Sequence, residues 1–212
     1  RGLGDVYKRQ ANRAFPAWSS LRFQERAHFM LKIADIWDKR AQDYVIAAQY
    51  EGGGSYGKGM FEAGHVSETF RAAAGLCYGA IGEILPSQYG KVSTAVRVPT
   101  GVVGVISPWN VPGILTSRGF AFAMATGNTI VLKPSEETPY AGGLFFAEIL
   151  EEVGVPNGVF NVITASRDRT PEVGDELIDN PMVKGISFTG STPVGRRIAA
   201  KCGAHLKKCC IE

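Results

Sequence analysis

Cysteine and histidine are scarce in this sequence. Its 212 residues include only four cysteines and three histidines. No pair of cysteines has Cys-x-x-Cys spacing, and the histidines lie far from one another. Metal sites and disulfide frameworks usually depend on closely spaced ligands or regularly spaced cysteines. We therefore expect neither a metal site nor a disulfide framework.

Long apolar runs and charge of one dominant sign are also missing. No run approaches the roughly 18 apolar residues of a membrane span, and the N-terminus lacks the tripartite order of a secretory signal. The sequence has 23 Lys and Arg against 20 Asp and Glu, a net charge of +3, with no basic stripe. We therefore expect a cytoplasmic protein that binds neither membranes nor nucleic acids.

What the sequence does contain is ample apolar material, since 45% of its residues are hydrophobic. Residues 1–10 show no apolar period and look like the translated tail of a cloning or sequencing adaptor. We predict that residues 1–10 are a non-native tail outside the fold, which would begin near Ala11.

Residues 11–80 have the apolar spacing of helices. Ser20 can cap a long amphipathic helix that ends at Gly52–Gly54. A second helical pattern follows, with Ala63, Val66 and Phe70 on one face. Gly52, Gly54 and Gly57 match the spacing of a dinucleotide-binding turn, but a helix rather than a strand precedes them, so we interpret this run as a helix end.

Between residues 81 and 99 the apolar period shifts towards two around a Pro-Ser-Gln-Tyr-Gly turn. This pattern predicts a β-hairpin. Because a two-stranded ribbon is marginally stable alone, we expect it to lie against another domain or subunit.

Apolar strands and helical segments alternate over residues 100–212. The alternation predicts an α/β fold, a Rossmann-like parallel sheet with flanking helices on both faces. The expected strands are 102–106, 129–132, 159–163, 184–188 and 207–211, and the expected helices are 113–125, 138–152, 171–179 and 192–202.

Three of the loops that follow these strands carry candidate chemistry. Asn110 comes just after a buried strand, where open α/β sheets place their ligands. Lys133 and Glu136 could bind the hydroxyls of a ribose, or the same segment could be a helix cap that uses Ser135 or Thr138. Near residue 190, a glycine turn, a hydroxyl and a helix start favour an anion such as a pyrophosphate, although a capped helix that binds nothing stays open.

Four motifs in order resemble the aldehyde dehydrogenase superfamily from about Ala11 to Glu212. They are Pro108-Trp109-Asn110, Lys133-Pro134-Ser135-Glu136, Phe188-Thr189-Gly190-Ser191 and Ile211-Glu212. The stretches 69–76, 201–203 and 206–208 are most similar to the members that oxidise benzaldehyde, salicylaldehyde or vanillin.

The resemblance implies a role for each matching residue. Asn110 would stabilise the oxyanion and Glu212 would be the general base. The cofactor would be NAD, with NADP possible, because a carboxylate at Glu136 should repel a 2′-phosphate. The residues expected to bind it are Ile106, Ser107, Pro108, Trp109, Lys133, Ser135, Glu136, Phe188, Thr189, Gly190, Ser191 and Gly195.

The family's nucleophilic cysteine is expected beyond residue 212, so the catalytic domain would be truncated and this chain inactive. We expect Cys209 and Cys210 to be buried and inert in an apolar strand. The hairpin resembles the arm through which family members form homodimers or homotetramers. Phe120, Phe122 and Met124 could line a substrate tunnel or pack in the core.

Two other functions stay open beside oxidation of an aromatic aldehyde. One is a semialdehyde or acylating dehydrogenase of the same superfamily, although Glu212 argues against the acylating type. The other is a nucleotide-binding module without catalysis.

Overall fold

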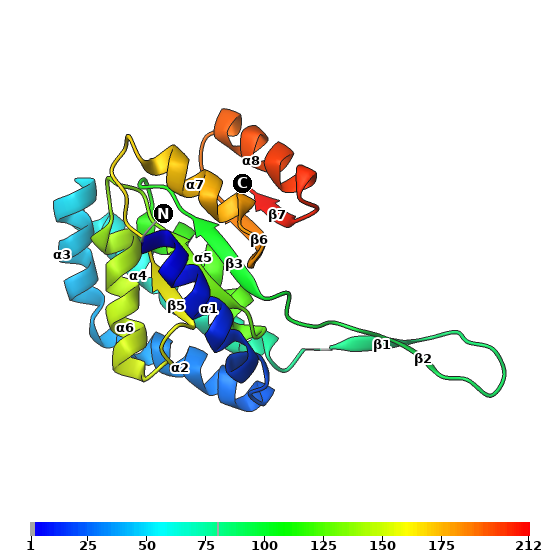
Figure 1. Ribbon diagram of the computed structural model, residues 1–212. Helices are drawn as coiled ribbons and strands as arrows, with labels where there is room; N and C mark the ends of the chain where they lie inside the picture. The colour runs from blue at the N-terminus through cyan, green and yellow to red at the C-terminus, as the bar shows by residue number, and fades with distance from the viewer. Residues whose placement is uncertain (1–2, 80) are drawn as a thin grey trace.

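A five-stranded parallel sheet organises the chain in the computed structural model, which describes residues 3–79 and 81–212 (Figure 1). The strand order is β5-β4-β3-β6-β7. The strands are β3 (Val102–Ile106), β4 (Thr129–Lys133), β5 (Phe160–Val162), β6 (Val183–Phe188) and β7 (Lys208–Ile211). Every neighbouring pair is parallel, so the α/β fold expected from the alternation is confirmed.

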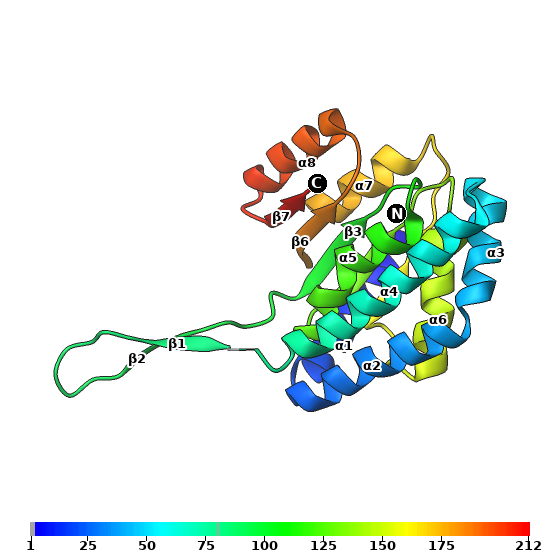
Figure 2. The same ribbon diagram turned by 180° about the vertical axis from the view of Figure 1, so that it is seen from behind.

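Helices cover both faces of this sheet (Figures 1 and 2). Four precede the sheet: α1 (Leu3–Ser19), α2 (Phe23–Lys39), α3 (Ala41–Gly52) and α4 (Tyr56–Leu76). The rest lie between strands: α5 (Pro112–Ala125), the π-helical turn η1 (Tyr140–Leu144), α6 (Phe145–Val153), α7 (Thr170–Asp179) and α8 (Thr192–Ala204).

Each face of the sheet has its own hydrophobic core. The larger core joins α2, α4, α5 and α6 to one face and includes the fully buried Trp37, whose ring stacks on Phe146 at 4.8 Å. Phe120 and Met124 are also fully buried there, so core packing, and not a tunnel, accounts for both side chains. The smaller core joins α1, α7 and α8 to the other face.

The first helix contradicts our expectation that residues 1–10 stay outside the fold. Residues 1–2 lie outside the described part of the chain, but α1 begins at Leu3. Lys8 is fully buried and pairs with Glu176 at 2.5 Å. The backbone carbonyl of Ala11 accepts a hydrogen bond from the Thr129 hydroxyl at 3.0 Å. Tertiary contacts with β4 and α7 therefore stabilise this helix, and Tyr7, Ala11 and Ala14, at spacings of four and three, pack against the two cores.

The expected long helix from Ser20 to the glycine run is two helices, and Ser20 is not its cap. The helix α2 begins at Phe23, and the Arg22 amide donates to Glu25 at 2.8 Å. Arg40 breaks the helical path between α2 and α3. Gly53 ends α3 in the left-handed region, at φ 64°, so the glycine run is a helix end, as predicted.

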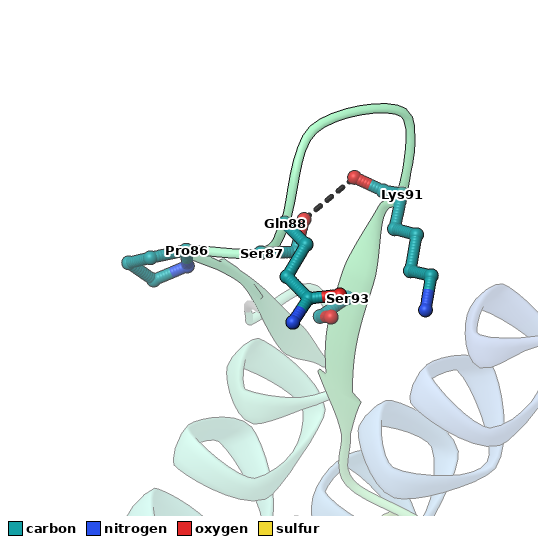
Figure 3. A pocket seen from close by; sticks show the side chains of 5 residues that line it. All are labelled: Pro86, Ser87, Gln88, Lys91 and Ser93. Atoms are coloured by element: carbon teal, nitrogen blue, oxygen red, sulfur yellow. Dashed lines mark hydrogen bonds between the residues drawn. The ribbon is translucent and has the colours of Figure 1, made fainter.

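The expected hairpin is present as β1 (Gly82–Leu85) and β2 (Ser93–Val96), an antiparallel pair. It projects away from the body of the molecule, and every residue of both strands is exposed. A small open hollow under its turn is lined by Pro86, Ser87, Gln88, Lys91 and Ser93 (Figure 3). This hollow lies far from the sheet, so we assign it no part in the candidate site.

Among the described residues, no helix is both long and apolar enough to cross a membrane.

Candidate functional site

The candidate site lies at the carboxyl edge of the sheet, where the chain changes direction. From β3 the chain moves outward through β4 to β5, and then returns to the other side of β3 to form β6 and β7. Open α/β sheets bind ligands at such a switch point. Backbone bonds tie its loops together: Ser107 N donates to Lys133 O at 3.2 Å, and Thr189 N donates to Ile106 O at 3.1 Å.

The loop after β3 presents Asn110 and Trp109 to solvent. Both residues are exposed, Trp109 by 54%. Ser107 is buried instead, with its hydroxyl 2.7 Å from that of Thr116, and Ile106 packs against the smaller core. The structure thus gives Ile106 and Ser107 packing roles in this loop and leaves Trp109 and Asn110 accessible to a ligand.

A buried carboxylate fixes the helix that follows Asn110. Glu62, fully buried on α4, accepts from the amide of Gly113 at 3.0 Å and from the Tyr44 hydroxyl at 2.8 Å. Lys58 forms an ion pair with the other oxygen of Glu62. The first turn of α5 is therefore already occupied by a negative charge. The sequence pattern does not reveal this role, because Glu62 lies 51 positions before Gly113.

Lys133 and Glu136 form an ion pair at the end of β4. Their charged atoms are 3.1 Å apart, Lys133 is 2% exposed, and the Glu136 side chain is 23% exposed. Partial burial alone would raise the pKa of Glu136, but hydrogen bonds from its own backbone amide and from Lys133 and Arg167 outweigh that effect and lower it. At neutral pH Glu136 is an ionised acceptor with one side facing solvent.

The sequence left two roles open for the segment that begins at Lys133, a ribose site and a helix cap. The structure shows which residue provides the cap. Ser135 accepts from the amide of Glu137 at 3.3 Å, which is a local turn bond. The start of η1 is instead capped by Glu51 from α3, whose two oxygens accept from Tyr140 N at 3.0 Å and Ala141 N at 2.7 Å. The cap therefore comes from another helix, and Glu136 remains free of a capping role.

The start of α8 differs from the other helix starts at this edge. Ser191 is its N-terminal flanking residue, no side chain caps the helix, and its first turn contains no acidic residue. By contrast, carboxylates occupy the starts of α5 and η1, and Glu172 lies in the first turn of α7. Of the helices that follow strands in the described chain, α8 has the start most open to an anion.

The glycines around α8 are explained by close contacts and not by a left-handed backbone. Gly190 does not have a positive φ. A Cβ there would lie 2.6 Å from the Phe188 ring, and one at Gly195 would lie 2.8 Å from Ile211 Cγ2. Both glycines let the loop and α8 lie close against β6 and β7.

Glu212 lies at the end of β7, beside the loop after β6. Its amide donates to Phe188 O at 2.9 Å, and its carbonyl accepts from Gly190 N at 3.1 Å. Its side chain is exposed. Asn110 and Glu212 therefore follow the two strands that flank β6, at one edge of the sheet, with Gly190 between their strands.

The cysteines contradict one further expectation. Cys209 and Cys210 are exposed, not buried, because β7 is the edge strand of the described sheet. Cys77 and Cys202 are the buried pair, and burial raises the pKa of both thiols. Within the described residues, no three His, Cys, Asp or Glu side chains are grouped to hold a metal ion.

The doubly wound sheet, its switch point and the open start of α8 define a Rossmann-like α/β domain with a ligand edge at β3 and β6. The chain belongs to the aldehyde dehydrogenase family, whose model matches residues 5–212.

Curated relatives and solved structures agree with this assignment. The chain is 40% identical to a vanillin dehydrogenase from Amycolatopsis over 203 residues, which cover 96% of the chain and 41% of the relative. It is 40% identical over 209 residues to an NAD(+) benzaldehyde dehydrogenase from Pseudomonas putida, covering 98% of the chain and 42% of the relative.

The fold superposes on a salicylaldehyde dehydrogenase from Pseudomonas putida, solved with salicylaldehyde, with a TM-score of 0.93 and 35% identity. That match covers 97% of the chain and 43% of the solved one. The chain thus spans less than half the length of these relatives.

Proposed function

We propose that this chain is the cofactor-binding part of an enzyme that oxidises an aldehyde, with NAD(P)+ as the hydride acceptor, to a carboxylic acid. The observation that carries the proposal is the pairing of an uncapped helix start at α8 with the Lys133–Glu136 pair on the same sheet edge. The first suits a pyrophosphate and the second suits the hydroxyls of a ribose.

The polar groups of this edge fit a dinucleotide. Glu136 would accept from ribose hydroxyls and Lys133 would donate to them, while the amides of the first turn of α8 would face the pyrophosphate. Ser191, whose hydroxyl caps no amide of α8, would donate to the same group. Trp109 and Thr189 would contribute contact surface on either side of the switch point.

Two exposed side chains would act on the aldehyde. The Asn110 amide would donate to the aldehyde oxygen as that oxygen gains negative charge, an interaction that can be worth about 3 kcal/mol. The Glu212 carboxylate would accept a proton from the attacking water. Glu62 fixes the first turn of α5 three residues after Asn110, which would limit the movement of the donor.

We propose a cysteine outside residues 1–212 as the nucleophile, which would form a thioester that water then hydrolyses. Cys77 and Cys202 are buried with raised pKa, and Cys209 and Cys210 lie along β7 and not in a loop at its end. Reading the gene past the codon for Glu212 tests this. We expect a glycine-rich loop containing a cysteine within about 50 codons, and a stop codon directly after Glu212 would contradict the proposal.

We propose aromatic aldehydes as the substrate class. The support comes from relatives named for vanillin, benzaldehyde and salicylaldehyde. We also propose that the longer protein works in the cytoplasm as a homodimer or homotetramer and that the exposed hairpin β1–β2 forms part of the contact between subunits.

The cofactor site is tested by calorimetric titration of the 212-residue chain with NAD+. We expect Lys133→Met to weaken binding by about tenfold, because it removes a charged donor. The matched control is Lys91→Met on the hairpin, which makes the same charge change away from the sheet and should leave the affinity unaltered. Absence of NAD+ binding by the unsubstituted chain would contradict the proposal.

Catalysis is tested in the same preparation by following NADH with benzaldehyde as the substrate. We expect cofactor binding without turnover, because we place the nucleophile outside residues 1–212. Sustained formation of NADH would show that a cysteine of this chain is the nucleophile and would contradict its placement outside the chain.

A further inference from the structure

Arg167, in the loop between β5 and α7, lies against the Lys133–Glu136 pair. Its Nε is 3.3 Å from one oxygen of Glu136, and its terminal nitrogen is 2.5 Å from Glu137. The side chain is 78% exposed, so it can exchange partners without disturbing the core. None of the four motifs includes Arg167, and its role depends on a contact 31 residues along the chain.

The charges around Glu136 are balanced. Lys133 and Arg167 carry two positive charges, and Glu136 and Glu137 carry two negative ones. An ionised carboxylate accepts hydrogen bonds from a ribose 2′-hydroxyl but repels a 2′-phosphate. A guanidinium has the opposite preference, because its planar set of donors matches phosphate oxygens.

The exposed guanidinium of Arg167 lies beside Glu136, the carboxylate proposed to bind the ribose. It therefore supplies the cation that a 2′-phosphate requires. When a ribose 2′-hydroxyl is bound, Arg167 can remain paired with Glu136 and Glu137. When a phosphate is bound, Arg167 can leave Glu137 and pair with the phosphate, and it continues to offset the charge of Glu136. Lys133 is buried and held by Glu136, so it has less freedom to follow a larger ligand.

We propose that Arg167 is a specificity residue that lets this site accept a 2′-phosphate, so that the chain binds NADP+ as well as NAD+. The inference rests on the proposed function, because it places the adenosine ribose at Glu136. It goes further by naming the residue that offsets the preference of Glu136 for an unphosphorylated ribose.

The test compares adenosine 5′-monophosphate with adenosine 2′,5′-bisphosphate, which differ only in the 2′ group, by calorimetric titration of the 212-residue chain. Arg167→Gln should weaken the bisphosphate by about tenfold and change the monophosphate less than about twofold. Glu136→Gln should shift the ratio of the two affinities in the opposite direction, towards the bisphosphate.

The matched control is Arg169→Gln. Arg169 is on the same loop and equally cationic, but its guanidinium pairs with Glu172 at 3.2 Å and not with Glu136. It should leave the ratio of affinities unchanged. An equal change in both arginine variants, or an unchanged ratio in Arg167→Gln, overturns the role of Arg167 while leaving the cofactor site intact. Failure of the unsubstituted chain to bind either nucleotide overturns the proposed site and this inference together.

Discussion

Glu136, at the carboxyl edge of the sheet, is both ion-paired and partly open to solvent. Partial burial would raise its pKa, but hydrogen bonds from its own backbone amide, Lys133 and Arg167 hold the pKa below the ordinary value for a glutamate. A lowered pKa in the folded state means that its stabilisation is present above the ordinary pKa and is lost as the pH falls through the lowered value.

Replacing Glu136 with Gln should therefore have an effect on stability that depends on pH. We expect the variant to be less stable by about 1 kcal/mol or less at pH 7, because the ion pairs are partly screened by solvent. The difference should shrink as the pH falls below about 4. Urea unfolding at several pH values measures it, and a difference that grew on acidification would contradict the assignment.

The four cysteines should separate into two classes of reactivity. Cys209 and Cys210 are exposed, whereas burial raises the pKa of Cys77 and Cys202 and limits access to both. Brief treatment of the folded chain with N-ethylmaleimide should label only Cys209 and Cys210, as read by peptide mass spectrometry. Labelling of all four in urea is the control, and equal labelling of Cys202 and Cys209 in the folded chain would contradict the structure.

At the scale of elements, helices from the N-terminal half determine how the loops of the sheet are held. Glu62 on α4 occupies the start of α5, and Glu51 on α3 occupies the start of η1. The start of α8 has no side-chain cap and no acidic residue in its first turn, so its backbone amides stay available to an anion. The N-terminal helices thus do more than cover one face of the sheet, since they support two of its ligand loops.

Glu51→Gln should weaken this support, because an amide offers one accepting oxygen where the carboxylate offers two and carries no charge to interact with the helix dipole. We expect a loss of about 1 kcal/mol in the free energy of unfolding. NAD+ affinity should also fall modestly, because η1 directly follows the loop after β4 that carries Glu136. Glu68→Gln, another glutamate on the N-terminal helices, is the control. Wild-type stability in Glu51→Gln would show that the two hydrogen bonds contribute little.

The hairpin β1–β2 is an element that makes its pairing bonds only within itself. Its exposed apolar side chains include Ile84 and Val92, both 81% exposed. Changing both to Ser should leave the melting temperature of the chain nearly unaltered, since exposed positions rarely shift stability by more than about 0.5 kcal/mol. In the longer protein the same change should reduce self-association in sedimentation experiments. Unchanged sedimentation of that protein would contradict a role of the hairpin at a subunit contact.

At the scale of the whole molecule, the strand order places the ligand loops on one edge and the hairpin away from it (Figures 1 and 2). Binding of NAD+ should therefore protect separate segments of the sequence at once. In hydrogen exchange we expect slower exchange at residues 134–141 and 189–195 and no change at residues 82–96. The chain should also melt at a higher temperature as NAD+ is raised. Protection confined to the hairpin would contradict the proposed site.

The sequence by itself determined the alternation of strands and helices, because apolar runs rich in β-branched residues, such as Val102–Ile106, favour strands buried on both faces of a sheet. It also determined that Asn110, Glu136 and Gly190 follow strands. Four ordered motifs then sufficed for the family, which the comparisons confirm.

Tertiary structure decided what local pattern could not. The place of helix α1 in the fold depends on contacts with β4 and α7, which lie more than a hundred residues away. The contacts of Glu51, Glu62 and Arg167 span 89, 51 and 31 residues. No periodicity encodes such contacts, because they depend on which helices the sheet brings together. The fold thus decides which helix start stays open to an anion and which cation lies beside Glu136.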